Sequence, residues 1–525
     1  MANSVVSSRR NSSDHTSAQF PPLTSEHYVP QTMPNVLGHR DMFFMYLAAL
    51  FLITNGVLSA SGGAISLLYL VVGAAIFFLP CVVIAAQLGV LFPHEGSLYN
   101  WTYHALGSFW SFFVGLLFWV AGMFSVIIGS VAFVTTLQGL NHAWLPNPWQ
   151  QGMAILVVLA AATAICLGRL RTTQSIMNII IMLTIFTTVL IAASGVIWLI
   201  EGHPAQTDFS FQAANWAPNP TNFFLFGIST LSFIGASGPL NLVGEFKGAR
   251  DDEALRRSII RRHLAMGTLC VVIMYVLIAF SVLVVRGQAM ATATVLPFEG
   301  FTAVYVVMGK WGGDLAVLGF LFYCIGAAII YMTISSRVIM AAAIDQRIPT
   351  WFARLNMARS PHNALLFQAF FLVIVVLVVF VVVPALDPIG GSAANALNII
   401  YNVVSASTTL VWTLATAFFF INAVLIYRRH TQYFRENLVL PLPVIWLCIV
   451  AGGVACLLTI AGILAYSWIP TQIADNLWWL PVVGLVVSVV AIASIGGLFA
   501  TGEATWEVTS REFASQASLE RKAKG

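Results

Sequence analysis

Charged residues are scarce in this sequence. Asp, Glu, Lys and Arg make up 8% of its 525 residues, whereas hydrophobic residues make up 59%. Water-soluble domains carry about 25% charged residues, so a water-soluble globule is excluded. Apolar runs such as 67–91, 108–137 and 176–200 are long enough to cross a bilayer core of about 30 Å as helices. Because the strict alternation of a membrane β-barrel is missing, the sequence predicts an all-α polytopic membrane protein.

Cysteine is also rare, and no two of the six cysteines form a CxxC pair. All six fall inside apolar runs, where free thiols behave as small buried apolar residues. A disulfide scaffold, a metal site and a cofactor are therefore not expected. Motifs of the forms G-x-S-x-G and H-E-x-x-H are missing as well, and we expect no enzyme.

Basic residues are confined to alternate loops of a twelve-span topology. If the N-terminus is cytoplasmic, only Arg286 and Lys310 among the 24 Lys and Arg lie outside. The positive-inside rule then predicts a multi-pass protein, which we place in the plasma membrane, with both termini cytoplasmic. We interpret the cluster Arg256–Arg262 as part of this signal, facing anionic lipid headgroups and not nucleic acid. The expected spans are 42–65, 66–91, 108–138, 151–168, 174–200, 221–243, 263–285, 314–341, 364–384, 395–427, 441–466 and 476–499.

Two of the expected spans are rich in residues that interrupt helices. The first contains Thr54-Asn55-Gly56, and the sixth contains the run Gly235–Pro239. Broken helices give a transporter free backbone groups that bind a ligand within the membrane. Because the two spans are five apart, a second five-span unit would start from the opposite side of the membrane, as in an inverted repeat. Close helix packing at Gly and Ser is the alternative interpretation.

Three motifs stand on the second, sixth and eighth expected spans. They are Ile76-Phe77-Phe78-Leu79-Pro80 through Gln87 to Trp101, Ser232-Phe233-Ile234-Gly235 with Gly244-Glu245-Phe246-Lys247, and Ser336-Arg337 through Asp345 to Pro349. Together they resemble permeases of the amino acid–polyamine–organocation (APC) superfamily, most closely its glutamate/GABA antiporter-like branch. The resemblance, from about Leu37 to Tyr427, implies a five-plus-five inverted repeat like that of the leucine-transporter group. It also implies two further helices and alternating-access transport of an amino acid or a related amine.

This fold would divide the chain into five parts. They are a disordered cytoplasmic tail (1–38), two five-helix repeats (39–200 and 201–436), the last two spans (437–500) and a cytoplasmic C-terminal tail (501–525).

The resemblance also implies where the substrate binds. Its carboxylate and amino group are expected on the exposed backbone of spans one and six, where helix ends supply partial charges. The residues implied are Ala48, Ala49, Leu50, Ser232, Phe233, Ile234, Gly235, Ser237 and Tyr331. The family register places the first break at Leu47–Leu50, about two turns before Thr54-Asn55-Gly56, and the sequence leaves both positions open.

Four residues are candidates for gating. Trp119 and Tyr331 are expected to close the pocket, although aromatic rings at span centres often serve packing alone. Glu245 and Arg337 are expected to form a charge network at the cytoplasmic ends of spans six and eight. The alternative is a solvated ion pair worth at most about 1 kcal/mol.

Ionisable residues are missing from the centres of all twelve expected spans. Such residues normally mark a proton relay or the partner of a charged substrate. We therefore expect a secondary transporter for a neutral or zwitterionic amino acid, working by exchange or facilitated diffusion, with a co-transported proton or an exchanged amino acid as its other partner. The hydroxyls of Thr333, Ser335 and Ser336 leave a sodium site open, although such groups usually bond to carbonyls one turn back. A non-transporting amino-acid sensor of the same fold is the alternative function.

Overall fold

All regular secondary structure of the described residues is helical, apart from one isolated β-bridge between Leu37 and Phe246. The computed structural model describes residues 22–141, 143–247, 253–287, 289, 298–386 and 393–524. In these residues, eleven helical segments are long and apolar enough to cross a membrane, and a bent pair, His39–Leu50 with Ile53–Gly62, adds a twelfth if it is one span. The predicted all-α polytopic class is confirmed, whereas the inverted repeat stays a prediction.

The helices follow one another with mostly short connections. Those of the spans are α2 (His39–Leu50) with α3 (Ile53–Ser59) and η1 (Ala60–Gly62); α4 (Ile65–Gly73) with the π-helix η2 (Ala74–Phe78) and α5 (Leu79–Leu91); α7 (Ser108–Leu140); α8 (Pro148–Cys166); α9 (Leu170–Ile200); α11 (Phe224–Phe233) with η4 (Gly238–Glu245); α12 (Glu253–Val285); α13 (Glu299–Ile344); α14 (His362–Leu377) with η8 (Val378–Val382) and α15 (Val383–Leu386); α16 (Ala393–Arg429); α18 (Leu442–Ala465); and α19 (Asp475–Lys524). The shorter elements are α1 (Thr24–Thr32), α6 (Ser97–Leu106), α10 (Ala213–Trp216), η3 (Pro220–Asn222), η7 (Thr350–Ala353) and α17 (Thr431–Glu436).

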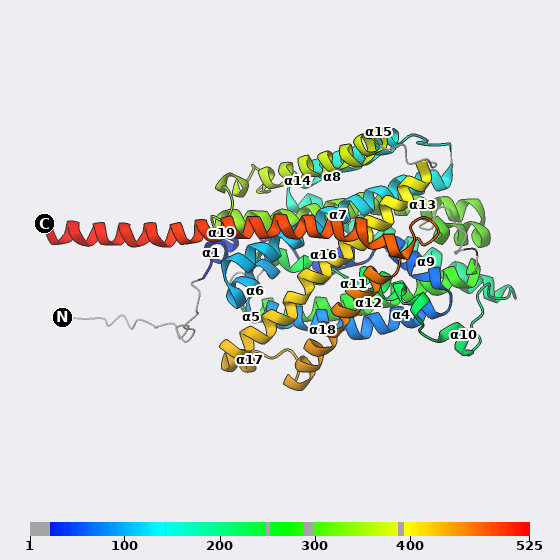
Figure 1. The fold of residues 1–525 in the computed structure, drawn as a ribbon, viewed down its shortest axis with the longest axis horizontal. Helices are drawn as coiled ribbons and strands as arrows, with labels where there is room; N and C mark the ends of the chain where they lie inside the picture. The colour runs from blue at the N-terminus through cyan, green and yellow to red at the C-terminus, as the bar shows by residue number, and fades with distance from the viewer. Residues whose placement is uncertain are drawn as a thin grey trace, which may run out of the picture.

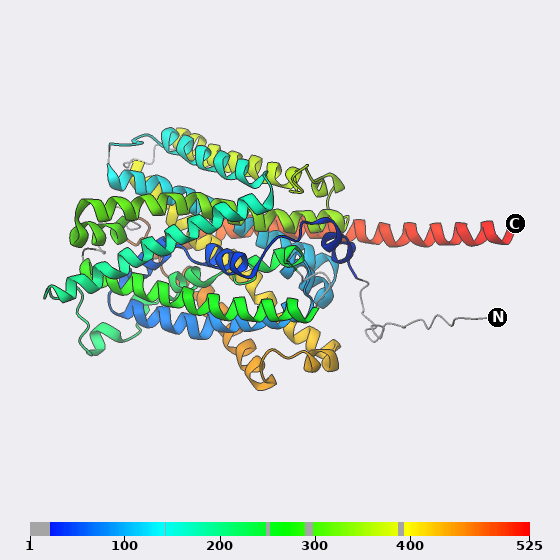
Figure 2. The same ribbon diagram turned by 180° about the vertical axis from the view of Figure 1, so that it is seen from behind.

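α1 and the C-terminal part of α19 lie at the same end of the helix bundle (Figure 1). The view from behind shows the same arrangement, with α19 extending beyond the bundle next to α1 (Figure 2). Both ends of the helical chain lie on the same side of a membrane only if the number of spans is even, so this placement agrees with twelve spans. We call this end, with residues 24–38, 92–107, 245–247 and 345–360, the inner end.

The first span breaks at Phe51 and Leu52. Both residues are extended, and the helices on either side of them are bent by 43°. Thr54-Asn55-Gly56 lies inside α3, so the break predicted there is wrong. The position that the family register gives, ending at Leu50, is nearer, because α2 ends at that residue.

The sixth span breaks where the sequence predicts, between Phe233 and Gly238. Ile234 is extended, and Gly235 has a φ of 99°, which favours glycine because a side chain would clash with the backbone. Pro239 occupies the first turn of η4, where its missing N–H leaves no intrahelical bond unmade.

The N-terminal segment is ordered from residue 24, so the prediction of disorder up to residue 38 is wrong for this part. Val29 and Met33 of α1 pack against Met340 of α13. Leu37 pairs with Phe246 in the β-bridge. These partners lie more than 200 residues away in sequence, and a polar composition gives no sign of them.

Candidate functional site

Three tyrosine hydroxyls bind the broken backbone of the first span. Tyr331 donates to the Ala49 carbonyl at 2.6 Å, Tyr275 to that of Leu50 at 2.8 Å, and Tyr323 to that of Phe51 at 2.6 Å, while the Leu52 N–H donates to the Tyr275 hydroxyl at 2.9 Å. An unbroken helix satisfies such groups within itself, and lipid offers them no partner. Side chains of α12 and α13 therefore take over the bonds that the break removes.

The two breaks lie side by side. A Cβ placed on Gly235 would lie 3.5 Å from the carbonyl oxygen of Ala49. Nearby, the hydroxyls of Ser59 and Ser232 are 3.2 Å apart. Spans one and six thus meet at their interrupted segments, the arrangement that the family resemblance implies.

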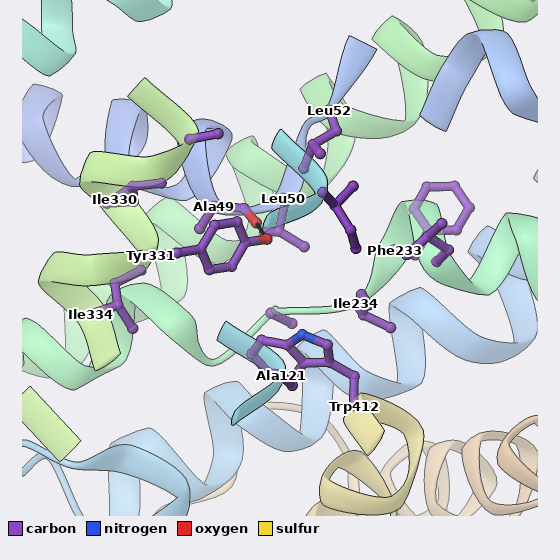
Figure 3. Close-up of a cluster of buried hydrophobic side chains, with 14 of the residues drawn as sticks. Ala49, Leu50, Leu52, Ala121, Phe233, Ile234, Ile330, Tyr331, Ile334 and Trp412 are labelled. Atoms are coloured by element: carbon purple, nitrogen blue, oxygen red, sulfur yellow. Dashed lines mark hydrogen bonds between the residues drawn. The ribbon is translucent and has the colours of Figure 1, made fainter. Parts of the chain in front are cut away.

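Uncharged side chains surround these breaks, as Figure 3 shows. Tyr331 points from α13 toward Ala49, and Trp412 of α16 lies across from it, close to Ile234. The Trp412 side chain is 2% exposed, and its ring packs edge-on against Phe118 with centroids 4.7 Å apart. This surrounding offers a ligand backbone dipoles and aromatic surface.

The indole N–H of Trp412 has no hydrogen-bond partner among the described residues. Buried Trp N–H groups usually find one, and an unsatisfied donor at this place could serve a ligand's carboxylate. Nothing in the sequence singles out Trp412 among 15 tryptophans. Only its position beside the two breaks does.

The other residues predicted around the sixth-span break differ in what they leave free. Phe233 stacks on Phe78 with centroids 4.9 Å apart, and Ser232 Oγ donates to the Ile228 carbonyl at 3.1 Å. Ser237 Oγ, in contrast, is buried and has no hydrogen-bond partner within the described ranges. Of the two predicted serines, Ser237 therefore has a hydroxyl available to a ligand.

Trp119 is not brought to this cluster. Its ring packs against Phe367 and Phe371 of α14, with centroids 5.6 and 5.1 Å away. There it lines an apolar crevice of about 320 Å³ between α7, α13, α14 and α19. These surroundings favour packing over the predicted gating role.

Two of the three hydroxyls considered for sodium bond to their own helix. Thr333 Oγ1 donates to the Ile329 carbonyl at 2.7 Å, and Ser336 Oγ donates to the Thr333 carbonyl at 2.8 Å. Ser335 Oγ is buried, and no described residue is its hydrogen-bond partner. Within the described ranges, no three His, Cys, Asp or Glu side chains are grouped to hold a metal ion.

Comparison with known protein families shows to which family the chain belongs. A sequence model of the family described as amino acid permease matches residues 37–491. The chain belongs to the amino acid permease family. The resemblance to APC superfamily permeases is thereby confirmed.

The relatives of this permease are transporters, and so is the permease. An uncharacterized transporter of Legionella pneumophila is 25% identical over 332 residues, which cover 59% of the permease and 66% of the relative. The arginine/ornithine antiporter of Lactococcus lactis is 20% identical over 387 residues, or 68% and 72% of the two chains. The D-serine/D-alanine/glycine transporter of Escherichia coli is 20% identical over 415 residues, or 76% and 81%.

A manganese transporter from Eremococcus coleocola has a similar fold. Its crystal structure superposes with a TM-score of 0.56 at 11% identity, covering 89% of the permease and 94% of that chain. At this identity the likeness extends to the fold alone, which is that of a helical membrane transporter.

The inner end of the permease holds a buried ion pair. Arg337 Nε of α13 donates to Glu245 Oε1 of η4 at 2.7 Å, and their side chains are 3% and 0% exposed. The predicted pairing is therefore present, and the solvated alternative is excluded by burial. Each charge depends on the other, because an unpaired buried charge costs several kcal/mol.

A second buried carboxyl lies beside this pair. Glu95, in the turn before α6, is 4% exposed, and neither of its carboxyl oxygens has a hydrogen-bond partner in the part of the chain that the structure describes. A Cβ placed on Gly244 would lie 2.9 Å from Glu95 Oε1, so the carboxyl rests on the backbone next to Glu245. By hydropathy Glu95 falls in a loop, so the sequence gives no sign that its carboxyl is buried.

α1 closes over the inner end with polar contacts from two of its residues, Ser25 and Glu26. The backbone N–H and the hydroxyl of Ser25 both donate to the Asp345 carboxylate at 2.8 Å. The Glu26 carboxylate accepts from Asn100 at 2.6 Å and lies 2.7 Å from His104 Nε2. Burial raises the pKa of Glu26, but the hydrogen bond and charge of His104 outweigh it and hold that pKa below its usual 4.5.

Proposed function

We propose that the permease carries a neutral, zwitterionic amino acid by alternating access between the two sides of the membrane. Its site would be the junction of the two breaks, with the carbonyls of Ala49 to Phe51 facing the ammonium group. The unpaired N–H of Trp412 and the hydroxyl of Ser237 would face the carboxylate. The observation that carries this proposal is the pairing of two broken helices with an uncharged surround.

The lack of charged groups around the breaks explains why a substrate with a neutral side chain is preferred. A substrate with a net charge, entering a site of low dielectric constant, requires an opposite charge or loses several kcal/mol of hydration. The residues around the breaks supply dipoles only, and these suffice for the two opposite charges of a zwitterion. The relatives include an antiporter of arginine and ornithine and a transporter of D-serine, D-alanine and glycine, and the uncharged surround favours the second kind of substrate.

Exchange or facilitated diffusion is the proposed mode, because the described spans hold no ionisable group at the breaks that would bind a co-transported proton there. The test is uptake of labelled amino acids into proteoliposomes of the purified permease. We expect uptake of one or more small neutral amino acids, accelerated by the same amino acid inside if the mode is exchange. No uptake across the standard amino acids, GABA and small amines refutes the proposal, and a ligand-dependent melting shift without flux would indicate a sensor.

The permease is proposed to lie in the plasma membrane with its inner end in the cytoplasm, as the positive-inside rule predicts. Cysteines introduced one at a time at exposed loop positions, in a chain without its own cysteines, test this orientation. An impermeant thiol reagent added to intact cells should label position 208 and spare position 436. Labelling at position 436 would reverse the assignment.

A further inference from the structure

Two buried carboxyl groups lie near one guanidinium at the inner end, and only one of them is paired with it. Arg337 is engaged by Glu245 at 2.7 Å, and Glu95 lies against the preceding residue of η4, Gly244, without a hydrogen-bond partner among the described residues. Both carboxyls are buried. An ionised Glu95 in this place would have neither water nor a donor to stabilise it, which costs several kcal/mol.

Among the residues that the structure describes, one cation acts on Glu95. Glu245 on η4 and Arg337 on α13 are the charged groups that act on it, and burial with the charge of Glu245 raises the pKa of Glu95 well above its usual 4.5. The charged groups next nearest have contacts of their own. Asp345 accepts from Ser25 and Tyr99, and Glu26 of α1 is engaged by His104 and influenced by His94. Arg347 acts on Tyr99, while its Nε and Nη1 have no hydrogen-bond partner among the described residues.

Binding of a proton to Glu95 would remove the cost of burying its charge. Protonation removes the buried charge and turns one Glu95 oxygen into a donor. Glu245 Oε2, which also lacks a hydrogen-bond partner, offers an acceptor on the neighbouring element. The packed inner end is therefore compatible with a neutral Glu95, whereas water reaching Glu95 would favour its ionised form.

We propose that Glu95 is a proton-binding site of the inner end, which takes up one proton when this end closes and releases it when the end opens. The inference rests on the proposed alternating-access cycle, in which the inner end opens and closes. The ligand is a proton exchanged with the solution on the inner side, so the site makes closure depend on the pH of that side. It does not require the proton to cross the membrane.

The sign of the pH effect follows from linkage. The closed state binds the proton more tightly than the open state, so a lower pH on the inner side favours closure. Between the ordinary pKa of this glutamate, 4.5, and the raised value, each pH unit changes the ratio of closed to open molecules by up to about tenfold.

The direct test is backbone hydrogen exchange of the intact permease in nanodiscs between pH 5.5 and 8, corrected for the intrinsic rate. We expect protection of residues 24–37 and 236–246 to rise toward acid by up to about tenfold per pH unit. Glu95→Gln, which imitates the protonated form, should be protected at every pH and show no slope. Glu436→Gln, an exposed change at the same end, should keep the slope of the unmodified protein.

Two results overturn the proposal. In the first, the hydrogen-exchange protection of the unmodified permease does not change with pH. This measurement does not depend on whether any variant folds. The other is Glu95→Gln with the slope of the parent, because another group then carries the titration. If the pH slope is found and is lost in Glu95→Gln while no amino acid is taken up, the proton site stands and the proposed function fails.

Transport supplies the second measurement. With the outer pH fixed, lowering the inner pH of proteoliposomes should slow exchange in the unmodified permease and leave Glu95→Gln unaffected. Only proteoliposomes with the inner end facing their lumen report this, so an impermeant reagent should first silence the opposite orientation. Flux that is insensitive to inner pH in both proteins refutes the proton site and leaves the proposed function intact.

Discussion

The middle and the inner end of the permease both contain buried polar groups that require partners, and different kinds of side chain supply these partners in the two regions. At the breaks, unpaired backbone is satisfied by the neutral hydroxyls of Tyr275, Tyr323 and Tyr331. At the inner end, buried carboxylates meet Arg337, Ser25 and His104. A charge costs least where water is near and most at the centre of the bilayer. The comparison teaches that strong, switchable contacts lie where opening supplies water, whereas the substrate site keeps dipoles alone.

The largest expected loss of stability comes from a substitution in the charged region at the inner end. Arg337→Ala leaves Glu245 buried without its partner, and we expect a loss of about 3–5 kcal/mol in the free energy of unfolding. Thermal melting in detergent measures the loss. Arg354→Ala, at an exposed arginine, should change stability by less than about 0.5 kcal/mol. Equal melting of the two variants would show that the buried pair contributes little.

The next effect tests the neutral region. Tyr275→Phe removes the hydroxyl that serves both Leu50 and Leu52 and leaves a buried N–H unsatisfied, at a cost of about 2 kcal/mol. Tyr323→Phe removes one donated bond, at a cost of about 1 kcal/mol. Melting curves of both variants give the comparison. If Tyr323→Phe is the more damaging, the double role of Tyr275 is not what holds the break.

A smaller effect separates binding from stability within the same region. Trp412→Phe keeps the aromatic packing and removes the N–H. We expect about tenfold weaker substrate affinity, the worth of one hydrogen bond to a carboxylate, with stability nearly unchanged. Competition uptake measures affinity, and Trp110→Phe, at a half-exposed ring on α7, is the matched control. Unchanged affinity in Trp412→Phe would remove this residue from the site.

The smallest effect concerns the contact of α1 with the inner end. Glu26→Gln should weaken this contact by about 1 kcal/mol, which is about a fivefold faster hydrogen exchange of residues 24–32. Because the folded pKa of Glu26 lies below 4.5, its contribution is present above that pH and is lost as the pH falls through the folded value. Exchange that accelerates on acidification in Glu26→Gln as in the parent would assign the effect to another group.

Much of the fold was predictable because the signals for it are local. Hydropathy marks each span, and the run Gly235–Pro239 marks the sixth-span break because glycine and proline dictate backbone geometry by themselves. The first-span break is different. Phe51 and Leu52 carry no helix-breaking signal, and tyrosines more than 220 residues away accept or donate the bonds that allow the break.

The candidate site was predictable in part for the same reason. Ala49, Gly235 and Tyr331 come together as the family register implies, and Glu245 meets Arg337. Trp412 and Glu95 were missed, since an unsatisfied donor or carboxyl is defined by what surrounds it. Trp119 shows the converse, because an aromatic residue at a span centre can face either the site or another helix.

Two of the three tyrosines that bind the first break, Tyr323 and Tyr331, stand on the same helix, α13. A shift of α13 against the first span therefore strains the bonds to Ala49 and Phe51 at the same time. Because these hydrogen bonds break together, intermediate positions of α13 relative to the first span are unfavourable. We therefore expect the first span to have two stable positions. A substrate that replaces these hydroxyls at the carbonyls would lower the barrier between them, and transport would then be triggered by occupancy.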